Sequence, residues 1–171
     1  PAGTDLYFNI EGIKTRLNTG NYSEPGTGGN IPAGEVYLPP TNKGVEGKVM
    51  IDGSLRTRRE TSIVKNPVIL TISKGEVVGI EGEKADSLKE SLDWAYNTSK
   101  NPDGVKMIGE LGIGINPDAC LVGPTIINEK LLGTAHVAIG SNYWFGGNIY
   151  AKIHLDQVFR KPKIEADGKV I

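Results

Sequence analysis

The chain has 171 residues, a length that predicts one domain with its own core. Its 19 Lys and Arg residues and 20 Asp and Glu residues leave a net charge of −1, which excludes a general polyanion binder. A single cysteine, Cys120, excludes a disulfide scaffold and agrees with a cytoplasmic location. No apolar run approaches the ~20 residues of a membrane helix. We therefore expect neither nucleic acid nor membrane as a partner.

Short strands joined by tight turns are indicated by the 23 glycines and 10 prolines. In chain order, we expect strands over 6–10 and 48–51, with a loop over 18–30 between them. Loops of that length are often functional. Residues 68–72 and 77–80 flank a Ser-Lys-Gly-Glu turn and are typical of a β-hairpin.

One amphipathic helix is predicted through 85–95, where apolar residues recur at spacings of three and four. Residues 97–104 should end it. A weaker helix is expected over 125–132. The alternation of apolar and polar residues over 149–156 predicts a strand, which Lys161-Pro162 should end.

The fold class that these elements predict is α+β. We expect a single domain with a mixed, twisted β-sheet and one or two covering helices. Near the end of the chain, Asp167-Gly168 should form a closing turn.

The chain has only two histidines, His136 and His154. In His154-Leu155-Asp156, the first and third side chains share one face of a strand, so an imidazole and a carboxylate converge where a divalent cation could bind. The alternative is a plain His–Asp hydrogen bond on an exposed face. His136 lies in an apolar stretch that is expected to be a buried strand, so its imidazole needs a metal ion or a backbone carbonyl as partner.

Two glutamates complete the candidates that the residues themselves suggest. Glu35 lies between a Pro-Gly turn and an apolar run, and is either a ligand or a solvated turn charge. Glu110 is flanked by glycines and apolar residues, which suggests burial and therefore pairing or metal binding. The glycines indicate close backbone approach, not phosphate binding. This oxygen-rich set fits one or two divalent ions such as Zn, Co, Mn or Mg.

Five stretches, taken in order, resemble the thermophilic-type metalloaminopeptidases, the family of aminopeptidase T, aminopeptidase S and related leucyl aminopeptidases. The resemblance implies that residues 1–171 are a C-terminal catalytic half and that a further domain precedes them, which agrees with a chain that opens at Pro1. The stretches are Gly3-Thr4-Asp5-Leu6, Asn30-Ile31-Pro32-Ala33-Gly34-Glu35-Val36, Gly109-Glu110-Leu111-Gly112-Ile113-Gly114, Gly133-Thr134-Ala135-His136-Val137-Ala138-Ile139-Gly140 and His154-Leu155-Asp156.

The resemblance also implies the site residues. The family has an acidic ligand five residues before its first metal histidine, where this chain has Leu131, so Glu129 replaces that ligand only with a two-residue insertion. Tyr143 matches the active-site tyrosine, and a glutamate such as Glu35 would serve as the base. The implied metal ligands are Glu35, Glu110, Glu129, His136, His154 and Asp156.

An aminopeptidase of this kind would use two divalent ions to activate water and would take peptide substrates, as a homodimer in the full-length protein. A related branch of the same scaffold instead cleaves dihydroxypyridine rings with one Fe(II) and O₂. Here that branch would use His136, His154 and Asp156, with the glutamates outside the iron ligands. A third hypothesis is an inactive or binding-only fragment.

Overall fold

A computed structural model describes residues 3–41 and 43–171 of the protein. Two of its helical segments are short: α2 covers Thr125–Asn128 and the 3₁₀ turn η1 covers Tyr143–Phe145. The longer helix α1 covers Ala85–Thr98. The strands are β1 Asp5–Phe8, β2 Arg16–Asn18, β3 Glu35–Leu38, β4 Val45–Ile51, β5 Ser54–Arg56, β6 Thr61–Ile63, β7 Val68–Ser73, β8 Glu76–Gly82, β9 Ile108–Gly114, β10 Thr134–Gly140, β11 His154–Arg160, β12 Glu165–Ala166 and β13 Lys169–Val170.

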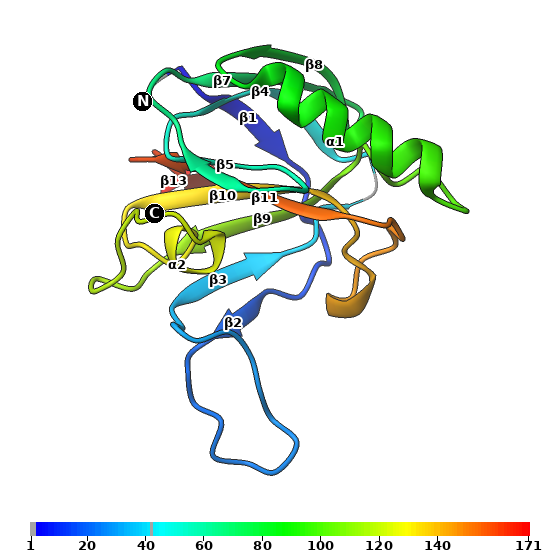
Figure 1. The fold of residues 1–171 in the computed structure, drawn as a ribbon. Helices are drawn as coiled ribbons and strands as arrows, with labels where there is room; N and C mark the ends of the chain where they lie inside the picture. Colours follow the sequence, from blue (N-terminus) through cyan, green and yellow to red (C-terminus); the bar gives the residue numbers. More distant parts are fainter. Residues whose placement is uncertain (1–2, 42) are drawn as a thin grey trace.

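The strands form two main sheets, which Figure 1 shows one above the other. The smaller sheet has the order β1-β4-β7-β8, and the larger has the order β2-β3-β9-β10-β11-β5-β6. A short hairpin of β12 and β13 follows near the chain end, as its Asp-Gly turn predicts. The α+β class with twisted sheets is therefore confirmed. No helix in the described part of the chain combines the length and the apolar character that crossing a membrane requires.

One cluster of buried apolar side chains joins both sheets and α1. Leu88 and Leu92 of α1 are almost fully buried in it, together with Val137 of β10. Burying a side chain of this size stabilises the fold by roughly 1.5–3 kcal/mol. The helix begins at Ala85, as its periodicity predicts, and ends at Thr98, inside the expected stretch. This apolar cluster leaves the opposite face of the larger sheet for polar side chains.

The predicted hairpin is confirmed as β7 and β8. Its turn residues Lys74 and Gly75 both have positive φ, 51° and 77°, which a two-residue turn of this hand requires. The predicted loop is also present, since β2 ends at Asn18 and β3 begins at Glu35. In Figure 1 this loop projects far from both sheets.

Three sequence predictions are wrong in extent, and the first is the strand expected over 6–10, which is β1 at Asp5–Phe8. The strand expected over 149–156 begins only at His154, because the side-chain oxygen of Asn142 accepts a hydrogen bond from the Ile149 backbone N–H at 2.8 Å and holds this segment in a loop. The helix expected over 125–132 is a single turn. It ends because the following segment runs extended beside Asn116, whose backbone pairs with residues 130 and 132.

Candidate metal centre

Five predicted site residues project from one face of four adjacent strands, β3, β9, β10 and β11. Asp156 lies opposite Ala138, which in turn lies opposite Glu110, so these three residues form one row across the sheet. Residues directly opposite each other in an antiparallel sheet point to the same side. Glu35 lies opposite Gly114 of β9, and His136 lies opposite Gly112 of β9. This register places both side chains on the same face. The apolar core covers the other face.

These polar side chains are withdrawn from solvent. Glu35, Glu110 and Glu129 are 5–6% exposed and His136 is 1% exposed. The interpretation of Glu35 as a solvated turn charge is therefore wrong. Three groups of donors have ligand atoms within 4.8 Å of one another: Glu35, Glu110 and His136; Glu110, His154 and Asp156; and Glu129, His136 and Asp156.

His154 has the environment of a metal-binding imidazole. Its Nδ1–H donates a hydrogen bond of 2.7 Å to the Ser141 carbonyl oxygen, which leaves Nε2 directed at the carboxylates. Nε2 lies 3.1 Å from Asp156 Oδ1 and 3.4 Å from Glu110 Oε2. Two donors that bind one ion side by side at ~2.1 Å each are themselves ~3.0–3.4 Å apart. His154 Nε2 therefore has the spacing of a neighbouring ligand from each carboxylate, and all three donors lie within 4.8 Å of one another.

Glu110 lies between the two histidines. One of its oxygens is 3.2 Å from His136 Nε2 and the other is 3.4 Å from His154 Nε2. Burial raises the pKa of Glu110, but the hydrogen bonds with both imidazoles outweigh burial and hold the pKa below its usual range. Glu110 thus stays ionised and ready to bind a cation.

Both imidazoles are held as cations when no metal is bound. Burial lowers the pKa of His154, but the charges of Asp156 and Glu110 raise it to about 11. Burial likewise lowers the pKa of His136, and the hydrogen bond to Glu110 and the neighbouring carboxylates raise it to about 9. The cluster therefore binds positive charge strongly, in the form of protons or of a metal ion.

The glycines of β9 explain how His136 fits. Gly112 lies opposite His136, and a Cβ atom at position 112 would stand 2.1 Å from the imidazole Cε1. A Cβ atom at Gly114 would stand 2.2 Å from the Leu131 carbonyl oxygen. The predicted close backbone approach is thus found at both glycines. His136 Nδ1 has no hydrogen-bond partner among the described residues, which leaves an unsatisfied buried nitrogen in the site.

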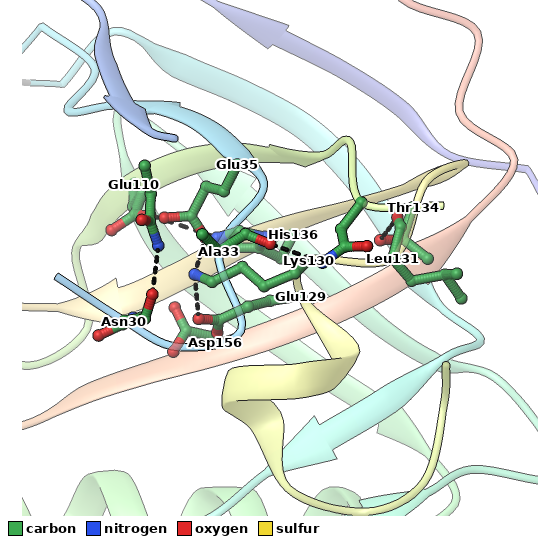
Figure 2. A network of polar contacts seen from close by, with 12 residues as sticks. Asn30, Ala33, Glu35, Glu110, Glu129, Lys130, Leu131, Thr134, His136 and Asp156 are labelled. Atoms are coloured by element: carbon green, nitrogen blue, oxygen red, sulfur yellow. Dashed lines mark hydrogen bonds and ion pairs between the residues drawn. The ribbon is translucent and has the colours of Figure 1, made fainter. Parts of the chain in front are cut away.

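Sequence reasoning missed Lys130. Its side chain is fully buried, and its ammonium group donates hydrogen bonds to Glu35 and, at 2.6 Å, to Glu129 Oε1. Figure 2 shows the ammonium group between these two carboxylates. Burial lowers the pKa of Lys130, but both glutamates raise it above its usual range, so the group is charged. The signal in the sequence was Gly114, which lets the segment 129–131 lie against β9.

The glutamates beside Lys130 differ from Glu110. Burial raises the pKa of Glu35, with the charges of His136 and Lys130 opposing it. Burial and the nearby Asp156 charge raise the pKa of Glu129 to about 7. Glu129 therefore lies in the cluster as the resemblance implies, but it is paired with an ammonium group and its pKa is raised.

Aromatic rings border the histidine end of the site. The Trp144 ring centroid lies 4.8 Å from that of His154, edge to face, and Phe145 lies 6.1 Å away. Trp144 is 64% exposed. Tyr143 is similarly exposed and packs against Tyr150. Within residues 3–41 and 43–171, its hydroxyl makes no hydrogen bond to the acidic and histidine side chains, so the structure does not bring Tyr143 into the cluster.

Comparisons with known proteins agree on the fold. The chain has a TM-score of 0.85 with the structure of 2,5-dihydroxypyridine dioxygenase from Pseudomonas putida KT2440, at 24% identity, over 99% of this chain and 50% of that one. It has a TM-score of 0.59 with AmpT from Thermus thermophilus, at 22% identity, over 89% of this chain and 42% of that one. The chain spans about half the length of these structures. No curated protein matches it.

The aminopeptidase resemblance holds only in part. The similarity to AmpT, which has an aminopeptidase-like fold, supports the shared scaffold. The assignment as a hydrolase with peptide substrates is wrong, because a different family matches the whole chain, residues 1–171. The sequence stretches that carry the resemblance did not separate the hydrolase branch from the dioxygenase branch. The chain belongs to the NicX family, described as 2,5-dihydroxypyridine 5,6-dioxygenase.

Proposed function

We propose that the chain holds the single ferrous ion of a ring-cleaving dioxygenase, with Glu110, His154 and Asp156 as its ligands. Membership of the dioxygenase family supports the reaction type. The observation that carries the metal position is the spacing of His154 Nε2 from the two carboxylates, 3.1 and 3.4 Å, with Nδ1 held by the Ser141 carbonyl. Imidazole and carboxylate donors both suit Fe(II).

This ligand set revises the one expected for the ring-cleaving alternative, which joined His136 to His154 and Asp156. The two histidines fall in different donor groups, and Glu110 lies between them. The usual non-haem iron site has two histidines and one carboxylate. Here Glu110 takes the place of one histidine, and His136 orients Glu110 through the contact at 3.2 Å.

The surroundings of His154 suit a flat aromatic substrate such as a dihydroxypyridine. Trp144 and Phe145 flank the imidazole, and the exposed Trp144 offers an apolar ring surface. When bound, ferrous iron supplies the electron transfer that lets O₂ react with an electron-rich ring. The role of Trp144 is to orient the substrate ring beside the metal.

We also propose that the chain is the metal-binding half of the dioxygenase, because it matches about half of each of the two solved structures. The other half of the cleft would then come from outside residues 1–171. The homodimer and the cytoplasmic location stay predictions.

The proposal is tested by loading the full-length protein, which supplies both halves of the cleft, with Fe(II) under nitrogen and then admitting O₂ with 2,5-dihydroxypyridine. We expect about one iron per chain, and loss of substrate absorbance in step with O₂ uptake. The His154→Ala variant should lose both. Iron bound at this ratio without ring cleavage, or ring cleavage that survives His154→Ala, would contradict the proposal.

A further inference from the structure

A buried ammonium group stands inside the carboxylate cluster. The Lys130 side chain is 0% exposed, and the side chains of its partners Glu35 and Glu129 are 6% and 7% exposed. A charge so far from water is stable only when it is paired and hydrogen-bonded. Lys130 and the two glutamates are therefore an internally paired unit, in which one ammonium group binds both carboxylates (Figure 2).

The partners of Lys130 are also metal-type donors. Glu35 belongs to the donor group with Glu110 and His136, and Glu129 belongs to the group with His136 and Asp156. In each group the donor atoms lie within 4.8 Å of one another. A second divalent ion in this cluster would need these carboxylates, each of which already accepts a hydrogen bond from the ammonium group.

We propose that the Lys130 ammonium group is a built-in cation that replaces a second metal ion, so that the cluster accepts one divalent ion. The inference rests on the proposed function for the position of that ion, at Glu110, His154 and Asp156. Charge favours this arrangement. The ammonium group already supplies positive charge to Glu35 and Glu129, and it would repel a second divalent ion at short range in a medium of low dielectric.

The test is a metal count with Mn²⁺ as the probe, in the wild-type chain and in Lys130→Ala. Bound manganese is measured by elemental analysis after equilibrium dialysis, and electron paramagnetic resonance separates isolated Mn²⁺ from a coupled pair. We expect the count to rise from about one ion per chain in the wild type to about two in Lys130→Ala, with the signal of a coupled pair. A purely structural role of Lys130 would not produce that signal.

A double variant provides the matched control. Lys130→Ala/Glu129→Gln lacks the ammonium group and also lacks a carboxylate that the second ion needs, so its count should return to about one. If Lys130→Ala does not fold without metal, it is refolded in Mn²⁺, and the wild-type count still decides, because two ions in the wild type would overturn the proposal.

The outcomes separate this inference from the proposed function. A folded Lys130→Ala chain that still binds one ion overturns the role of Lys130, while ring cleavage by the iron-loaded wild type is judged independently. A wild-type chain that binds no divalent ion overturns both.

Discussion

The site consists of two halves that handle buried charge differently. In the lysine half, made of Glu35, Glu129 and Lys130, the positive charge is part of the chain and fully buried. In the histidine half, made of Glu110, His154 and Asp156, the His154 and Asp156 side chains remain 20% and 17% exposed. One half is closed and satisfied by the protein itself. The other is partly exposed to solvent, and its imidazole nitrogen is already directed at two carboxylates.

The comparison predicts its largest effect at Lys130. Lys130→Met keeps the length of the side chain but leaves two buried carboxylates without their cation, and removal of one partner of a buried ion pair costs about 3–5 kcal/mol. We expect the free energy of unfolding of the metal-free chain to fall by this amount in urea denaturation. Asp156→Asn, in the more exposed half, weakens the pairing with His154 but leaves Glu110 beside the imidazole, so it should cost less, about 1.5–3 kcal/mol. Equal losses in the two variants would remove the distinction between the halves.

The second effect is on metal affinity. His154→Ala removes the metal donor that the Ser141 carbonyl orients. Mutating a residue that only hydrogen-bonds to a metal ligand already lowers metal affinity about 10–100-fold. We therefore expect the dissociation constant for Mn²⁺ to rise at least about 100-fold. Isothermal titration calorimetry measures the constant, and circular dichroism checks that the fold is retained. Unchanged metal content in this variant would show that the ion binds elsewhere.

A third, smaller effect concerns the sheet beneath His136. Gly112→Ala places a methyl group within 2.1 Å of the imidazole, and such overpacking costs about 1–3 kcal/mol. The control is Gly28→Ala, where a Cβ atom meets nothing within 4 Å. We expect a lower melting temperature and weaker Mn²⁺ binding in Gly112→Ala only. If both variants melt like the wild type, His136 is not positioned by this glycine.

The histidine half was predictable because it depends on local rules. His154 and Asp156 share a face through the period of two in a strand, and the flanking glycines and apolar residues of Glu110 indicated its burial. Helix α1 was predictable for the same reason, because its period of 3.6 is written in neighbouring residues.

The lysine half was not predictable, because it depends on distant contacts. A Glu-Lys pair after a short helix resembles a solvated surface segment, and only the pairing of Asn116 with the segment around Leu131 turns Lys130 inward. This pairing needs Gly114, because a side chain at position 114 would collide with the backbone of residues 129–131, which lie further along the chain. The choice between one metal ion and two therefore lay in the part of the site that sequence patterns reveal least.

The last prediction uses pH to compare the metal-free and metal-bound forms. In the metal-free chain the pKa of His136 is raised to about 9, so the stability that its protonated form contributes is complete below its unfolded value of about 6.5 and is lost as the pH rises through 9. Metal binding has the opposite sign, because His154 must lose its proton to bind the ion, and its pKa is raised to about 11. Between pH 7 and 9, the melting temperature of the metal-free chain should fall, while the increase that Mn²⁺ produces should grow. Scanning fluorimetry at several pH values measures both quantities in one series. If the melting temperature changes with pH equally in the metal-free and Mn²⁺-bound forms, the ion and the proton do not compete for His154. The metal would then bind outside the histidine half.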